Sequence, residues 1–279
     1  MKDITFGSYY RADSPIHRLD ARVKILLLIA LMVAIFTAKG TVSFAVIICF
    51  TLMCMLMTRV PFRLYVKSMR HLLVLVTVTS LLNIFYTPGV IHLFDWWIFH
   101  PTFEGLLFSL KMIARIVSLI VLSSALMYTT TPIALTDAIE SLLRPLKVVR
   151  FPVHETATMM TLALRFIPTL LEETDKIMNA QKARGANFES GGVFKRAKAL
   201  IPVLVPLLIS AFRRAPELAT AMECRCYNGG KGRSKLRVMK MGKRDLFAAI
   251  AVCLLLAAVI TARVKGIDIP QWSVILNLR

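Results

Sequence analysis

The chain has 279 residues, 57% of them hydrophobic, and a formal net charge of +19. Soluble globular domains average about 45–50% apolar residues, so the composition argues against that class. In a soluble protein, so large a positive charge would suggest binding to nucleic acid. The sequence has no nucleic-acid-binding motif, however, and membrane proteins concentrate Lys and Arg in their cytoplasmic loops. We therefore predict an all-α polytopic membrane protein that lies in the lipid bilayer and binds no nucleic acid.

The N-terminal part of the chain is predicted to hold a polar segment followed by four membrane spans. A helix needs roughly 17–25 apolar residues to cross a bilayer. The polar segment covers residues 1–23, and a four-helix transmembrane region covers residues 24–128. Its apolar blocks lie at about residues 24–38, 41–57, 71–86 and 103–128.

The fourth apolar block carries two basic residues, Lys111 and Arg115. They are four positions apart and therefore lie on one face of a helix. One interpretation is that both side chains reach out to the membrane surface. The other is that they face the helix bundle or a cavity, since both lie well inside the block. The sequence leaves both interpretations open.

The middle of the chain, residues 129–244, has 20 Lys or Arg against 9 Asp or Glu. Helical spacing of apolar residues predicts three helices here, at about residues 132–149, 153–184 and 193–227. The second and third each begin with an apolar half that contains proline and is short for a membrane span. We predict one amphipathic helix and two long, bent coupling helices at the cytoplasmic face, then a fifth span and a tail at residues 245–279.

The distribution of basic residues predicts the orientation of the spans. The loop at residues 59–70 is basic, whereas residues 87–103 contain no Lys or Arg and include Trp96 and Trp97. The positive-inside rule then places the N-terminus and residues 129–244 in the cytoplasm. Five spans place the C-terminal tail outside.

Two arginines stand near the ends of the two predicted coupling helices. Arg184 lies in the stretch AQKARG at residues 180–185, and Arg225 lies in AMECRC at residues 221–226. Positive side chains favour helix C-termini, so both arginines fit a helix-capping role. An arginine at a protruding helix end can also bind a carboxylate of another protein through two hydrogen bonds. Both roles stay open, and the repeated pattern favours a partner with two similar sites.

Three motifs give the chain a resemblance to a known family. They are the N-terminal stretch FGSYYRADSPIHRLDARVKILLL, the triplet Ala183-Arg184-Gly185, and the stretch Ala221 to Tyr227 around Arg225. Over nearly its whole length the chain resembles the transmembrane T component (EcfT/CbiQ-like) of energy-coupling factor transporters. In that family, two arginine motifs end the coupling helices and dock into grooves on two cytoplasmic ATPase subunits. The resemblance implies an ATPase-coupling role for Ala183, Arg184, Gly185, Cys224, Arg225 and Cys226, with cysteines replacing the common Ala and Gly in the second motif.

The resemblance further implies a membrane scaffold rather than an enzyme. Such a scaffold joins two cytoplasmic ABC ATPase subunits to a small membrane-embedded substrate-binding subunit that captures a vitamin or a metal ion. ATP hydrolysis is expected in the partners, since this chain lacks the G-x-x-x-x-G-K-[ST] phosphate loop. The expected location is the cell membrane of a bacterium or archaeon, and we expect no cofactor and no metal site in this chain.

Two other functions stay open from the residues alone. The permease of a standard ABC importer also couples to ATPases, but usually through one short coupling helix. An integral membrane lipid-modifying enzyme would need acids or histidines clustered at one depth. The acids of residues 129–244 instead fall on amphipathic helix faces, where solvated charge is the usual explanation.

Overall fold

The computed structural model describes residues 9–86, 102–145, 152–188, 192–229 and 241–265. In these ranges the regular elements are α-helices, which confirms the predicted all-α class. The helices are α1 (Ala21–Thr37), α2 (Thr41–Thr58), α3 (Phe62–Tyr86), α4 (Phe103–Thr129), α5 (Pro132–Leu142), α6 (Val153–Ala183), α7 (Val193–Glu223) and α8 (Lys243–Val264).

The chain divides into two compact units. The bundle unit comprises Gly7–Leu135 and Met239–Arg279, and so contains α1 to α4 and α8. The long-helix unit comprises Met1–Phe6 and Thr136–Val238, and so contains α6, α7 and most of α5.

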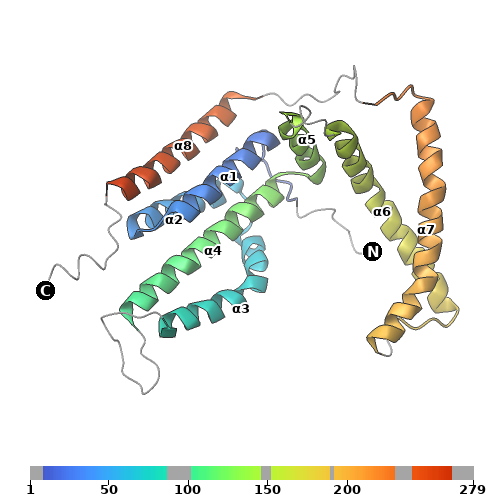
Figure 1. Cartoon of the computed structure of the whole chain (residues 1–279), viewed down its shortest axis with the longest axis horizontal. Helices are drawn as coiled ribbons and strands as arrows, with labels where there is room; N and C mark the ends of the chain where they lie inside the picture. The colour runs from blue at the N-terminus through green and yellow to red at the C-terminus, as the bar shows by residue number, and fades with distance from the viewer. Residues whose placement is uncertain (1–8, 87–101, 146–151, 189–191, 230–240, 266–279) are drawn as a thin grey trace. The chain divides into compact units, whose positions relative to one another are not determined.

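Within the bundle unit, α1, α2, α4 and α8 lie side by side and α3 packs against α4 (Figure 1). The buried centre is apolar and comes from four of these helices; it includes Leu31, Ala34, Ile35, Phe44, Ile47, Leu122, Val252, Leu255 and Val259. Gly105 allows the close approach of α3 to α4, because a Cβ atom there would lie 3.0 Å from the carbonyl oxygen of Asn83. Many other apolar side chains of the bundle point outward, as expected for a surface that faces lipid.

Four helices are long and apolar enough to cross a membrane, namely α2, α4, α7 and α8. The two parts of α3 meet at 65° and raise the number to five if they form one span. The predicted first span, α1, has 17 residues and is slightly shorter than these. This agrees with a polytopic membrane protein. α7 meets the criterion by length and composition alone, although the sequence assigned it to the cytoplasmic coupling region.

α7 is long enough to meet this criterion because it is one continuous, bent helix, as the sequence predicted. It continues through Pro202, Pro206 and Pro216 for 31 residues. A proline inside a helix removes one backbone hydrogen bond and bends the helix, but it does not have to end it. In Figure 1, α7 changes direction along its length.

The predicted amphipathic helix is shorter than expected. It ends at Leu142, whereas apolar spacing extended it to residue 149. Pro145 explains the early end, because it has no backbone N–H to donate to the carbonyl of Ser141 and disfavours the α-helical conformation at Arg144. The predicted interfacial residues Trp96 and Trp97, and the tail after Lys265, lie outside the described residues.

Candidate functional site

The two long helices expose much of their apolar surface. Only 6% of the apolar part of α7 is buried inside the chain. Large exposed side chains on the two helices include Met159, Met160, Ile167, Leu171, Leu200, Ile201, Leu204, Val205, Leu208, Ile209 and Phe212. This surface needs lipid or another protein to cover it.

An ion pair ties the charged halves of α6 and α7 together. The guanidinium of Arg214 lies 2.6 Å from the carboxylate of Glu173, and both side chains are half-buried. Partly buried, charge-assisted hydrogen bonds of this kind are stronger than exposed ion pairs. The two charged halves are therefore held as one pair of helices.

The end of α6 forms a Schellman motif, a common way for a helix to terminate. The N–H of Ala186 donates to the carbonyl of Gln181 at 3.0 Å, and the N–H of Gly185 donates to the carbonyl of Lys182 at 3.0 Å. Gly185 has φ +86°, a left-handed conformation that glycine adopts without steric cost. We call residues 181–186 the first tip.

The end of α7 repeats this geometry, residue for residue. The N–H of Tyr227 donates to the carbonyl of Met222 at 3.0 Å, and the N–H of Cys226 donates to the carbonyl of Glu223 at 2.8 Å. Cys226 takes the left-handed position with φ +57°. We call residues 222–227 the second tip. Its similarity to the first, which the sequence indicated only through a short alignment, extends to the backbone.

Arg184 and Arg225 hold the same position in their tips, immediately before the left-handed residue. Both side chains are exposed, as are those of Ala183, Cys224 and Cys226. Among the residues that the structure describes, neither guanidinium has a hydrogen bond or an ion pair. Because backbone N–H groups already satisfy the last carbonyls, the helix ends do not need these guanidinium groups as caps. Both remain available to a partner.

Cys224 and Cys226 are free thiols on the surface of the second tip. In the described part of the chain, no three His, Cys, Asp or Glu side chains come together as metal ligands. A zinc site takes three or four such ligands, so these two thiols alone do not form one.

The two basic residues of α4 have different surroundings. Arg115 donates from Nη2 to the carbonyl of Ala38 at 2.9 Å, at the end of α1, and its guanidinium lies 5.2 Å from the ring centroid of Phe44. A cation is favourable at a helix C-terminus, so Arg115 links α4 to α1 inside the bundle unit. Lys111 is half-buried one turn earlier on the same helix.

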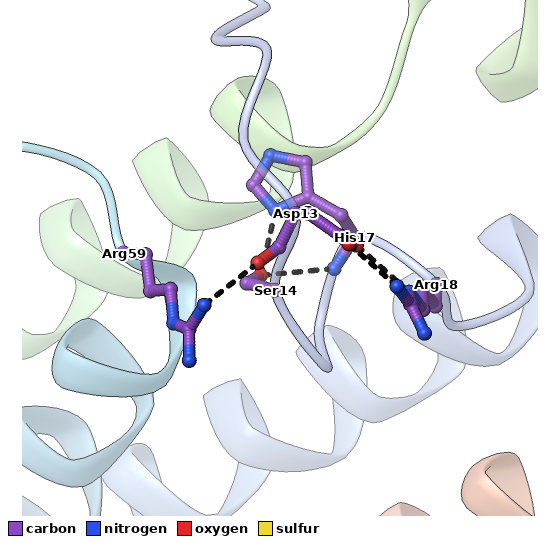
Figure 2. A network of polar contacts seen from close by, with 5 residues as sticks. All are labelled: Asp13, Ser14, His17, Arg18 and Arg59. Carbon is purple, nitrogen blue, oxygen red and sulfur yellow. Dashed lines mark hydrogen bonds and ion pairs between the residues drawn. The ribbon is translucent and has the colours of Figure 1, made fainter.

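The N-terminal segment is held by a network of polar contacts around Ser14 (Figure 2). Ser14 is buried, and its hydroxyl lies 2.6 Å from Nδ1 of His17, while Nε2 of His17 donates to the carbonyl of Tyr10 at 2.9 Å. Arg59 of the α2 end donates to the carbonyl of Asp13 at 3.3 Å. The Ser-x-x-His spacing thus has a structural explanation: it closes a turn over the bundle.

Asp13 and Arg18 form an exposed ion pair in the same network. The hydrogen bond from Arg18, and then its charge, hold the pKa of Asp13 below its ordinary value. A carboxyl group whose pKa is lowered by folding stabilises the folded state above its unfolded pKa, and this contribution disappears on acidification through the lower folded pKa. At neutral pH the pair is therefore fully formed.

The sequence did not reveal the roles of Asp20, Lys24 and Asp245. Asp20 caps the N-terminus of α1 by accepting from the N–H of Arg22 at 3.0 Å. Lys24 is buried and donates to the end of α4, and Asp245 is buried and accepts from the N–H of Asp20. The only signal in the sequence was an aspartate, a capping residue type, just before a lysine in an apolar block.

Comparison with known proteins gives consistent matches over most of the chain. The family model CbiQ, described as cobalt transport protein, matches residues 12–236, which include both tips. The chain is 47% identical over 265 residues to the energy-coupling factor transporter transmembrane protein EcfT of Clostridium kluyveri, covering 95% of this chain and 98% of that protein. It is 42% identical over 257 residues to the EcfT protein of Bacillus subtilis, covering 92% and 97%.

Proposed function

This chain belongs to the CbiQ (cobalt transport protein) family, and from this membership we infer that it is the transmembrane component of an energy-coupling factor transporter. It is a multi-pass membrane protein and a transporter subunit. The family favours this function over a standard ABC permease and over a lipid-modifying enzyme. The N-terminus and residues 129–244 are assigned to the cytoplasmic side, in line with their basic charge.

The proposed mechanism starts at the two tips. Two cytoplasmic ATPase subunits bind them, with Arg184 in a groove of one subunit and Arg225 in the equivalent groove of the other. The observation that carries this proposal is the shared backbone geometry of the two tips, each presenting an exposed arginine at the same position. Two nearly identical ligands suit two similar subunits, and arginine suits bidentate contacts with carboxylates or helix ends.

The long helices then transmit the motion of the ATPases. When ATP binds and is hydrolysed, the two tips change their separation, and α6 and α7 move with them. The exposed apolar faces of these helices form the surface on which a separate membrane-embedded substrate-binding subunit docks. Methionines such as Met159 and Met160 adapt to different partner surfaces, which suits a scaffold shared by several such subunits.

The substrate class is a vitamin or a metal ion, and the choice between them lies with the substrate-binding subunit. The scaffold itself holds the ATPases and that subunit in one complex. ATP hydrolysis is assigned to the partner subunits, because this chain has no phosphate loop.

Charge reversal at each tip tests the proposal. We expect Arg184→Glu and Arg225→Glu each to reduce substrate uptake and co-purification of the ATPases by at least about tenfold, because a buried interfacial arginine is often worth 2 kcal/mol or more. The bundle should stay folded, since both side chains are exposed. The measurements are uptake by cells that express the complete complex and the amount of ATPase retained after purification.

Matched controls exist on the same helices. Lys176→Glu and Arg213→Glu reverse exposed charges of α6 and α7 outside the two tips, and both should retain assembly and uptake. If Arg184→Glu and Arg225→Glu behave like these controls, the two arginines have no coupling role.

A further inference from the structure

Apart from its first residues, the chain passes between the two units at two places. It leaves the bundle unit after α4, within α5, at Leu135. It returns at Met239, shortly before α8. Motion of the long-helix unit can reach the bundle along these two connections. The way in which each connection is attached to the bundle therefore matters for coupling.

The first connection is attached to α1 by a buried lysine. Nζ of Lys24 donates to the carbonyl of Thr129 at 2.8 Å and lies 3.3 Å from the hydroxyl of Thr130. Thr129 is the last residue of α4, and Thr130 is its C-cap. Lys24 is 7% exposed. A buried ammonium at a helix C-terminus satisfies carbonyls that have no partner within the helix, and it complements their partial negative charge.

The second connection is attached to the same turn of α1 by a buried aspartate. Asp245, 6% exposed, lies in the first turn of α8. Its Oδ1 accepts from the N–H of Asp20 at 2.9 Å, and its Oδ2 accepts from the N–H of Gly242 at 2.7 Å. Asp20 is the N-cap of α1. One carboxylate thus fixes both the start of α8 and the start of α1.

We infer that the N-terminal turn of α1, through Asp20 and Lys24, is the anchor at which both connections transmit the motion of the long-helix unit to the bundle. Lys24 and Asp245 are positioning residues in this scheme: they bind neither nucleotide nor substrate. A connection anchored by a buried charge-assisted hydrogen bond passes on a displacement, whereas an unanchored connection absorbs it by changing its own backbone angles. This inference rests on the proposed function, because it assumes that the long helices move with the ATPases.

The test uses the complete complex in lipid nanodiscs and needs no knowledge of the substrate. Hydrogen exchange is measured with and without a non-hydrolysable ATP analogue, for wild type, Lys24→Met and Asp245→Asn. We expect the nucleotide to change exchange in α6 and α7 equally in all three. In α1, α4 and α8, we expect the nucleotide-induced change to be at least about fivefold smaller in the two variants, which corresponds to the loss of an ordinary coupling energy.

Arg115→Met is the matched control. It removes a cation that also binds the carbonyl at a helix C-terminus, but at the other end of α1, away from both connections. The nucleotide response of the bundle should survive in this variant. Asp245→Asn is the milder variant, because it retains one acceptor oxygen. It provides the test if the complex with Lys24→Met does not assemble.

The outcomes separate the two proposals. A full nucleotide response in the bundle of Lys24→Met or Asp245→Asn overturns the anchor. A response that is lost equally in Arg115→Met also overturns it, because a general loss of bundle packing then explains the data. If the wild-type complex shows no nucleotide response in α6 and α7, the proposed function itself fails, and the anchor fails with it.

Discussion

Cys226 carries the main chemical difference between the two tips. It occupies the left-handed position that Gly185 occupies in the first tip. For a residue with a Cβ atom this conformation costs roughly 1–2 kcal/mol, because the Cβ approaches the following carbonyl oxygen. The second tip thus keeps the backbone geometry of the first in spite of an unfavourable residue, which indicates that the surrounding hydrogen bonds determine the turn.

This strain predicts the effect of exchanging the two residue types. Cys226→Gly should stabilise the second tip by up to about 1 kcal/mol, after the added flexibility of the unfolded chain offsets part of the gain. Gly185→Ala should destabilise the first tip, and the cause would be φ alone, since an added Cβ there meets no atom within 4 Å. Thermal unfolding of the purified complex measures both. A lower melting temperature for Cys226→Gly would contradict the assignment of strain.

The two thiols of the second tip also allow a test of whether the end of α7 docks onto an ATPase subunit. Cys224 and Cys226 are exposed in the chain alone, and we propose that an ATPase subunit covers them in the complex. A membrane-impermeant maleimide should therefore label both rapidly in the isolated chain and much more slowly in the complex. The other three cysteines, Cys49, Cys54 and Cys253, lie in α2 and α8, which are long and apolar enough to span the membrane, so we expect little labelling by such a reagent there. Equal labelling rates in the two samples would argue against docking at this tip.

At the scale of the elements, the sequence predicted most helices because apolar periodicity and length are strong signals. It was wrong at Pro145, because α5 ends before this proline although the sequence extended the helix to residue 149. It was right that the third helix continues, bent, through its prolines, since Pro202, Pro206 and Pro216 lie inside a continuous α7. Whether a proline ends or only bends a helix depends on what satisfies the freed carbonyl, and this is decided by the folded surroundings.

The second tip was only partly predictable for a related reason. The order of apolar half, charged half and arginine could be recognised in both long helices. The Schellman turn at Cys226 could not, since glycine is the usual sequence signal for a left-handed helix end. The equivalence of Arg184 and Arg225 therefore rests on the backbone hydrogen bonds of both tips rather than on the sequence alone.

At the scale of the whole molecule, the all-α class and the membrane location followed from composition, but the contacts that hold the bundle unit together did not. Lys24 and Thr129 are 105 positions apart, and Asp20 and Asp245 are 225 positions apart. A single sequence gives the type of each residue but not which distant residue it meets. The sequence places Lys24 and Asp245 at the starts of two apolar blocks, but it indicates neither their burial nor their partners.

The long separation between Asp20 and Asp245 has a consequence for biosynthesis. The ribosome adds about 5–20 residues per second, so the first helix waits roughly ten seconds or more for the residue that completes its N-terminus. Until then, the N–H of Asp20 lacks its partner carboxylate and α1 lacks its contacts with α8. A chain that ends at residue 242 should be degraded faster in a pulse-chase experiment than one that ends at residue 265, which retains α8. Equal half-lives would contradict this. Faster loss of the shorter chain would mean that the contact between the first and the last helix marks a chain whose synthesis has passed α8.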